Sequence, residues 1–367
     1  MLVSRKLEIC ICGGGHVAHA LAAVMGANPD ISVTVVTRRP ETWRAEIHAV
    51  YGDLVLVGRP ARITADYASA AGADVIIIAA PAFAHRSIMA AIRPFLAPDT
   101  WVGALPAHGF FDWLAASTFG PQARIFGSQR PPYNCRITIP GREVEILGVA
   151  SSLPIAAAPR RNIGQVQAFL ESALSLPITA LDNFLSITLA PLPSILHPAR
   201  LFTLLRDWDG CTPFERVPLL YEDWDDAASA TYLAFDAELQ AVCASLPLDM
   251  SDVVPVRSHY GISTASALTV RIRTLPGLRG IAAPMRAADG GHLPDLHSRV
   301  FLEDFPFGLK AIRLVAALVG VATPMLDTVE AWSRLPPIAP RNPAAAADCS
   351  ERVNGRRLEE LLAVATR

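Results

Sequence analysis

The sequence predicts an α/β protein in which a doubly wound parallel sheet is followed by a mostly α-helical second domain. The chain opens with a short apolar run at residues 7–12, three glycines, and a stretch at 18–23 with high helix propensity. Further apolar runs alternate with helical stretches through the first half, which is typical of a parallel sheet. Beyond about residue 185 helical patterns dominate. We therefore expect two domains.

The glycine-rich turn after the first strand fits the dinucleotide fingerprint G-x-G-x-x-A. Gly13 makes the tight turn, Gly15 lets a pyrophosphate approach the backbone, and Ala18 permits close packing of the helix on the strand. The N–H groups around His16 and Val17, at the helix start, favour an anion. A strand before the glycines and a helix after them distinguish this motif from an ordinary glycine turn. We predict a Rossmann-type domain that binds a nicotinamide dinucleotide.

The end of the second predicted strand, residues 31–36, indicates which dinucleotide is bound. Thr37, Arg38 and Arg39 follow it, where the NAD form of this fold carries an acid for the ribose 2′-OH. A guanidinium matches a 2′-phosphate instead, so NADP(H) is favoured over NAD(H). A solvated basic turn is the alternative. Pro81 follows a buried apolar run at the carboxyl edge of the sheet and is predicted to join the cofactor site.

The expected boundary places a dinucleotide-binding domain at residues 1–185 and a helical substrate domain at 186–367. Residues 53–57 and 61–65 are two short stretches that are compatible with a hairpin. The other predicted strands are 74–80, 100–105 and 123–126, and the predicted helical stretches are 201–205, 227–246 and 309–321.

Composition narrows the partners and the compartment. The formal net charge is −2 and no basic block occurs, so nucleic acid is not expected as a partner. No apolar run is long enough to span a bilayer, so no membrane association is expected. The six cysteines show no C-x-x-C spacing, which favours free thiols in a cytoplasmic protein. We expect no metal site, and a monomer or a homodimer.

Three polar groups of the second half have both structural and functional interpretations. His197 lies beside prolines in an apolar segment, where a structural histidine is common. Arg299 could pair with Glu303 at i,i+4, and Asp304 could cap a helix that begins near Pro306. The acidic run at residues 220–226 could simply start a helix. Taken singly, none of these patterns defines a site.

Taken together, the motifs resemble the opine dehydrogenases of the octopine and nopaline type. The resemblance extends over nearly the whole chain and depends on the order and spacing of the motifs. They are CGGGHVAHALA at 12–22, QRPPYNCRI at 129–137, LHP at 196–198, DWDG at 207–210, LYE at 220–222, DGG at 289–291 and RVFLEDFPFG at 299–308.

This resemblance implies a reversible reductive condensation of an amino acid with a 2-oxo acid, pyruvate or 2-oxoglutarate, to an N-(1-carboxyalkyl) amino acid. It implies that His197 acts as acid and base, Asp304 holds the imidazole, and Arg299 clamps the carboxylate of the oxo acid. The substrate site is implied to include three further residues: His108, Arg130 and Cys135.

The chain departs from the family pattern at three places. Val300 stands where tyrosine is frequent, His108 where a polar residue such as glutamine is frequent, and Arg130 where a small or hydroxyl residue occurs. The charge of Arg130 would favour the larger diacid, 2-oxoglutarate. Glu222 or Asp223, if either lines the cleft, would favour a basic amino donor, and a neutral donor is the alternative.

Two other functions remain open from the sequence. One is a dehydrogenase of the ketopantoate-reductase or glycerol-phosphate type, whose members commonly rely on a lysine, whereas this chain has only Lys6 and Lys310. The other is a non-catalytic NADP-binding sensor, which would leave His197, Arg299 and Asp304 without a role.

Overall fold

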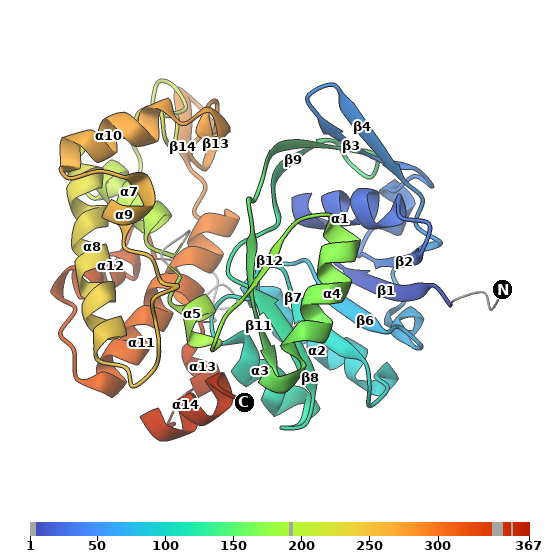
Figure 1. Ribbon diagram of the computed structural model, residues 1–367. Helices are drawn as coiled ribbons and strands as arrows, with labels where there is room; N and C mark the ends of the chain where they lie inside the picture. Colours follow the sequence, from blue (N-terminus) through green and yellow to red (C-terminus); the bar gives the residue numbers. More distant parts are fainter. Residues whose placement is uncertain (1–4, 191–193, 340–347, 354) are drawn as a thin grey trace. The chain divides into compact units, whose positions relative to one another are not determined.

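The computed structural model describes residues 5–190, 194–339, 348–353 and 355–367 (Figure 1). The chain forms two compact units, which divide after Ile187, and the C-terminal segment Leu361–Arg367 belongs to the first. The expected second domain, residues 186–367, is therefore wrong at its C-terminal end. Backbone hydrogen bonds hold this end to unit 1, because Phe184 N donates to Ala365 O and Arg160 N donates to Arg367 O, both at 2.9 Å.

Unit 1 is built on an eight-stranded sheet in the order β12-β11-β8-β7-β6-β1-β2-β5. Its neighbouring strands pair in parallel, except for β11, which is antiparallel to β8. The strands are β1 (Leu7–Cys12), β2 (Ile31–Val36), β5 (Arg62–Thr64), β6 (Val75–Ile78), β7 (Trp101–Ala104), β8 (Arg124–Ser128), β11 (Leu153–Ala158) and β12 (Ile178–Ala180).

The strand order reverses at β1, and this reversal positions the ligand crevice of the fold. β1 pairs with β2 on one side and with β6 on the other, so the loops that follow β1 and β6 diverge at the carboxyl edge. Ligands of open α/β sheets bind at such a switch point. The four residues of β6 are all buried, as expected for a strand covered on both faces. The predicted α/β class is confirmed.

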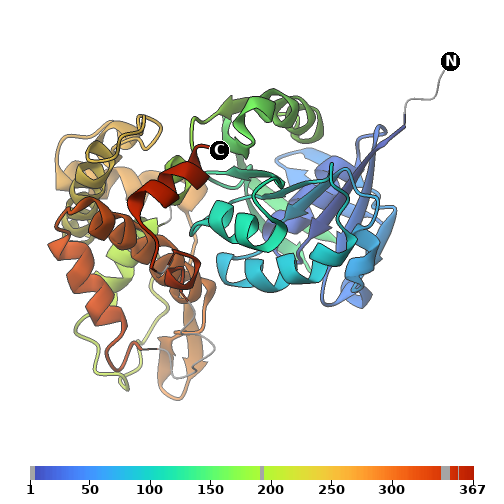
Figure 2. The ribbon, with the colours of Figure 1, turned by 90° about the horizontal axis from the view of Figure 1, so that it is seen from below.

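Helices cover both faces of this sheet. α1 (His16–Gly26) and α4 (Ile163–Leu174) contact each other on one face. α2 (Ala82–Ile92) and α3 (Phe111–Phe119) contact each other on the opposite face, and Figure 2 shows them side by side in cyan and teal. The short helix α5 (Leu185–Thr188) spans the division between the units.

A second sheet of four strands packs on the far side of α1, in the order β4-β3-β10-β9. The predicted hairpin of 53–57 with 61–65 is wrong: β4 pairs antiparallel with β3, and β5 joins the main sheet beside β2. Two α1 histidines fasten this sheet, because His16 Nδ1 accepts from Ile137 N at 2.9 Å and His19 Nε2 accepts from Gly141 N at 2.8 Å. The strands are β3 (Ile47–Tyr51), β4 (Leu54–Gly58), β9 (Tyr133–Ile139) and β10 (Glu143–Val149).

Unit 2 is mostly helical, as predicted, and carries one short hairpin. Its apolar helical stretches bury one face each, and α8 supplies the long central helix. None of the helices in the described residues is long and apolar enough to cross a membrane. The helices are α7 (Leu196–Leu205), α8 (Asp226–Ala244), α9 (Val256–Tyr260), α10 (Ala265–Thr274), α11 (Lys310–Val319), α12 (Pro324–Ser333), α13 (Ser350–Val353) and α14 (Leu358–Ala365), the last continuing into unit 1; the hairpin is β13 (Met285–Ala288) with β14 (Gly291–Pro294).

Candidate active site

The imidazole of His197 lies in the first turn of α7 and has hydrogen-bond partners on both ring nitrogens. Nδ1 lies 2.6 Å from Asp304 Oδ2, and Nε2 lies 2.7 Å from the hydroxyl oxygen of Tyr221. Pro198 is tolerated beside His197 because the first N–H groups of a helix have no intrahelical acceptor. The three side chains therefore form a continuous chain, Tyr221–His197–Asp304, inside unit 2.

Asp304 reaches His197 because of an unusual backbone segment. Val300–Leu309 is a π-helix with Pro306 inside it, and such widened turns are frequent at functional sites. At its end a Cβ on Gly308 would lie only 2.8 Å from Ser194 Cα, so glycine permits the close approach to the start of α7. Asp304 does not cap a helix near Pro306. Its side chain is 1% exposed and is directed to His197.

Arg299 precedes this π-helix and contacts two of its carboxylates. Its Nη1 donates to Glu303 Oε2 at 2.7 Å and lies 3.9 Å from Asp304 Oδ1. Partial burial lowers the pKa of the guanidinium, but the charges of Asp304 and Glu303 outweigh burial and raise it overall. The i,i+4 pair expected from helix geometry does form, yet Glu303 is 7% exposed while Arg299 remains 51% exposed. Arg299 is therefore anchored at one end and accessible to a ligand.

Tyr221 has no role among the residues predicted from the sequence, although it lies in the LYE motif of the family resemblance. That motif was its only signal, because a buried tyrosine in an acidic run has no distinctive spacing. The neighbouring acids accept hydrogen bonds from the backbone: Glu222 Oε2 accepts from Gly280 N at 2.7 Å, and Asp223 Oδ2 accepts from Leu219 N at 2.8 Å. Their suggested contact with a basic amino donor is therefore not supported.

The dinucleotide fingerprint folds as predicted in unit 1. A Cβ on Gly13 would lie 2.2 Å from the carbonyl oxygen of Ala79, so the glycine permits β1 and β6 to approach. A Cβ on Gly15 would meet nothing within 4 Å. The first helical bond runs from His19 N to Gly15 O, so the N–H groups of Val17 and Ala18 precede the helical ladder. Open space beside these donors fits a pyrophosphate.

The residues expected around the rest of the cofactor lie at the same carboxyl edge. Thr37 is buried after β2, and its hydroxyl oxygen would lie 2.6 Å from a Cβ on Gly14. Arg38 and Arg39 are exposed, and neither forms an ion pair with any residue of the described ranges. Pro81 lies three residues after the end of β6 and directly precedes α2. These positions fit the predicted nucleotide site.

The three expected substrate residues differ in their surroundings. His108 follows β7 and Arg130 follows β8, so both lie at the carboxyl edge of the main sheet. Arg130 Nη2 donates to Ser152 O at 2.9 Å, and burial lowers the pKa of its guanidinium. Cys135 lies in β9 within the apolar cluster, where burial raises the thiol pKa to about 12. The burial of Cys135 argues against substrate contact, and we leave it out of the proposed site.

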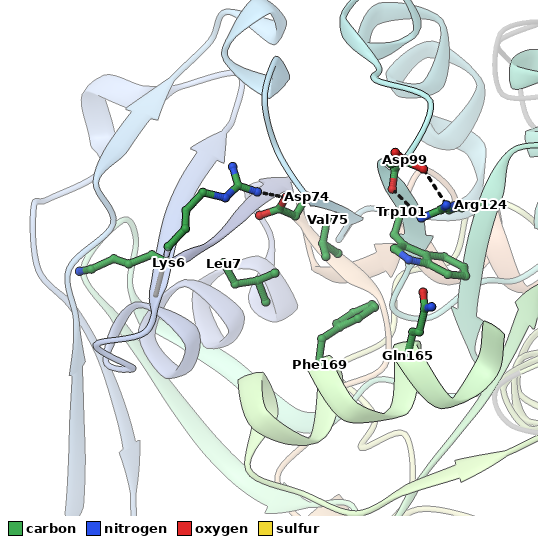
Figure 3. Close-up of a pocket in the computed structure, with 10 residues that line it drawn as sticks. Lys6, Leu7, Asp74, Val75, Asp99, Trp101, Arg124, Gln165 and Phe169 are labelled. Atoms are coloured by element: carbon green, nitrogen blue, oxygen red, sulfur yellow. Dashed lines mark hydrogen bonds and ion pairs between the residues drawn. The ribbon is translucent and has the colours of Figure 1, made fainter. Parts of the chain in front are cut away.

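One hollow of unit 1 is not part of this site. It has a volume of about 600 Å³ and lies where β1, β6 and β7 begin, at the edge opposite the glycine turn (Figure 3). Its charges largely pair with each other, as Arg5 does with Asp74 and Arg124 does with Asp99. We assign it no ligand.

A dinucleotide-binding sheet and a helical unit with a buried His–Asp pair define the chain as a nicotinamide-dependent dehydrogenase. Comparison with known proteins identifies the family. Residues 180–335 match the family described as "NAD/NADP octopine/nopaline dehydrogenase, alpha-helical domain", and residues 8–102 match "NADP oxidoreductase coenzyme F420-dependent". The opine dehydrogenase of Haliotis discus hannai is 31% identical over an alignment of 369 residues, gaps included. The alignment covers 90% of this chain and 90% of the relative.

Solved structures agree with this assignment. Two structures of octopine dehydrogenase, one titled with NADH and L-arginine and one with NADH and pyruvate, are each 27% identical to this chain. Each similarity covers 97% of this chain and 98% of the other, with a TM-score of 0.80. The chain belongs to the opine dehydrogenase family and is an NAD(P)-dependent oxidoreductase that acts on CH–NH bonds.

The two fingerprint glycines should respond differently to substitution. Gly15→Val should abolish cofactor binding but leave the protein folded, since its side chain enters open space that the pyrophosphate needs. Gly13→Ala should destabilise unit 1, because the new Cβ overlaps Ala79 O. Thermal unfolding and NADPH fluorescence titration measure both effects. Normal NADPH affinity in Gly15→Val would show that the turn does not hold the dinucleotide.

Proposed function

We propose that this protein condenses the amine of an amino acid with the carbonyl of pyruvate or 2-oxoglutarate and reduces the resulting imine with NADPH. The observation that carries the proposal is the buried His197–Asp304 pair with Arg299 beside it. These groups match the chemistry that the reaction needs: an acid–base group, a carboxylate that orients it, and a cation for a carboxylate substrate.

His197 and Asp304 supply the proton transfers in this proposal. The Asp304 carboxylate accepts from Nδ1–H, which leaves Nε2 as the nitrogen that exchanges protons. As the amine adds to the carbonyl, one amine proton passes to the carbonyl oxygen, which becomes a hydroxyl. The imidazolium then gives that hydroxyl a second proton, its C–O bond breaks, and water leaves while the nitrogen lone pair forms the C=N bond of the iminium. The negative charge of Asp304 stabilises the imidazolium before this transfer. The bound dinucleotide supplies the hydride.

Arg299 fixes the oxo acid. A guanidinium binds a carboxylate through two parallel hydrogen bonds, which sets the plane of the adjacent carbonyl. Glu303 holds the arginine from the buried side while half of the Arg299 side chain stays exposed. The prochiral face offered to the hydride then depends on one anchored side chain.

Replacement of His197 tests the reaction itself. His197→Ala should lower kcat about 10²–10⁴-fold, the usual contribution of a positioned acid or base, with NADPH affinity unchanged. Asp304→Asn should also lower kcat, since the imidazolium loses its charged partner. His259→Ala, in α9, is the control. The assay follows NADPH absorbance across amino acids paired with each oxo acid; tight NADPH binding without turnover by any pair would indicate a sensor instead.

Arg299→Ala should chiefly raise the KM for the oxo acid, by about 10- to 100-fold, as expected for loss of a charge-assisted bond worth about 1.5–3 kcal/mol. The KM for NADPH should not change. Arg356→Ala is a matched control, because Arg356 is 52% exposed and pairs with Glu360 at i,i+4 as Arg299 does with Glu303. Equal KM values for the oxo acid in the wild type and Arg299→Ala would refute the clamp.

The preference for NADP(H) is supported by two exposed guanidiniums, Arg38 and Arg39, that follow β2 without carboxylate partners in the described ranges. Replacing both with glutamine should weaken NADPH about 10-fold or more and leave NADH nearly unchanged, because only NADPH carries the 2′-phosphate. Titration of each cofactor against wild type and variant measures this. A wild type with equal affinity for both cofactors contradicts the preference.

We also propose a cytoplasmic location, supported by the six cysteines, all of which are free thiols. The oligomeric state expected is a monomer or a homodimer.

A further inference from the structure

The proposed function gives no role to the contact between His197, its acid–base group, and Tyr221. His197 Nε2, the nitrogen that must exchange protons with a substrate, lies 2.7 Å from the Tyr221 hydroxyl oxygen. The imidazole is 10% exposed and Tyr221 is 6% exposed. A reacting oxygen can therefore exchange a proton with Nε2 only through the Tyr221 hydroxyl or by displacing it.

We infer that Tyr221 relays the proton between His197 and the substrate oxygen that leaves as water. The inference rests on the proposed function. A hydroxyl has one donor hydrogen and two acceptor lone pairs, so it can receive and donate a proton in one step. The imidazolium Nε2–H bond breaks as an O–H bond forms at Tyr221. The original Tyr221 O–H bond breaks as an O–H bond forms on the hydroxyl of the amine adduct, and the C–O bond to that hydroxyl breaks. The products are a neutral imidazole, an unchanged tyrosine, water and an iminium, whose C=N bond is formed by the nitrogen lone pair.

The backbone around Tyr221 is fixed from several directions, as a relay requires. Leu220 N donates to Ile281 O at 2.7 Å and Ala283 N donates to Pro218 O at 2.8 Å. After the tyrosine in the chain, the side chain of Glu222 accepts from Gly280 N at 2.7 Å. These bonds tie the turn to residues 280–283 on both sides of the tyrosine. Because the turn is held and the ring is buried, displacement of the hydroxyl by a substrate is the less favourable route.

The charges around the phenol also suit a relay. Negative charge develops on the Tyr221 oxygen if its own proton leaves before the new one arrives. Arg299 is close enough to interact electrostatically with Tyr221, and it stays cationic because Asp304 and Glu303 outweigh the cost of its burial. A nearby guanidinium stabilises a developing phenolate. Arg299, which is proposed to bind the oxo acid, would therefore also favour proton transfer through the Tyr221 hydroxyl.

Removal of one oxygen atom tests the relay. Tyr221→Phe should lower the single-turnover rate of NADPH oxidation about 10²-fold or more, with the KM values for NADPH and oxo acid nearly unchanged. Tyr232→Phe is the control, because Tyr232 is a fully buried tyrosine of the same unit, and its aromatic contacts are with Trp224 and Tyr260. Thermal unfolding of both variants separates a loss of folding from a loss of proton transfer.

A proton inventory provides a readout that a merely structural role would not change. In mixtures of H₂O and D₂O the wild-type single-turnover rate should depend nonlinearly on the deuterium fraction, since two protons move together. Tyr221→Phe should give a linear plot with a smaller isotope effect. A linear wild-type plot, or a wild-type rate in Tyr221→Phe, would overturn the relay even if His197→Ala is inactive. Full activity of His197→Ala would instead overturn the proposed function.

Discussion

The hydrogen bond between His197 and Asp304 is the interaction on which the proposed chemistry of the helical unit depends. A carboxylate that is 1% exposed is costly unless charged or hydrogen-bonding partners surround it. Asp304 has His197 at 2.6 Å and Arg299 at 3.9 Å. Loss of one partner from such a buried pair typically costs about 3–5 kcal/mol. The same contact therefore contributes to stability and orients the imidazole.

Two local backbone features of unit 2, a π-helix and a glycine, allow this contact to form. Pro306 cannot donate a helical hydrogen bond, and the segment around it adopts the wider π-helical turn. With bonds that run from i to i+5, Arg299 lies one turn before Asp304 and meets both it and Glu303. Gly308 then allows the segment to approach Ser194, just before the histidine. A regular α-helix would direct these side chains differently.

The two units differ in how far their sites could be predicted from sequence. The cofactor cradle is made by the backbone of one continuous segment, so its glycines and its flanking strand and helix are readable locally. β1 and β2 begin and end at the predicted residues, because each is one continuous apolar run that can be recognised in the local sequence. The site of unit 2 combines side chains from residues 197, 221 and 304. No local rule brings these together, and only the family resemblance connected the first and the last.

The predictions that were wrong failed because they depended on contacts that residue type does not specify. Residues 54–58 form a strand, but their partner is residues 47–51, because Gly52 provides the left-handed backbone of a tight turn there. The acids Glu222 and Asp223 suggested a cation-binding cleft, but they bind backbone N–H groups. The C-terminal helix continues into unit 1 through main-chain bonds, which leave no trace in residue type.

Arg299 shows why a structural and a functional interpretation need not exclude each other. The i,i+4 pair with Glu303 forms, although the segment that follows Arg299 is a π-helix and not an α-helix. In a solvated pair both groups would be exposed and the bond would contribute little. Here the acid is buried and the arginine is half exposed, so the pair anchors the base of the guanidinium and leaves surface for a ligand. Arg299 stays charged because a guanidinium does not deprotonate in proteins, and in the proposed reaction it and the His197 imidazolium perform separate tasks in one site.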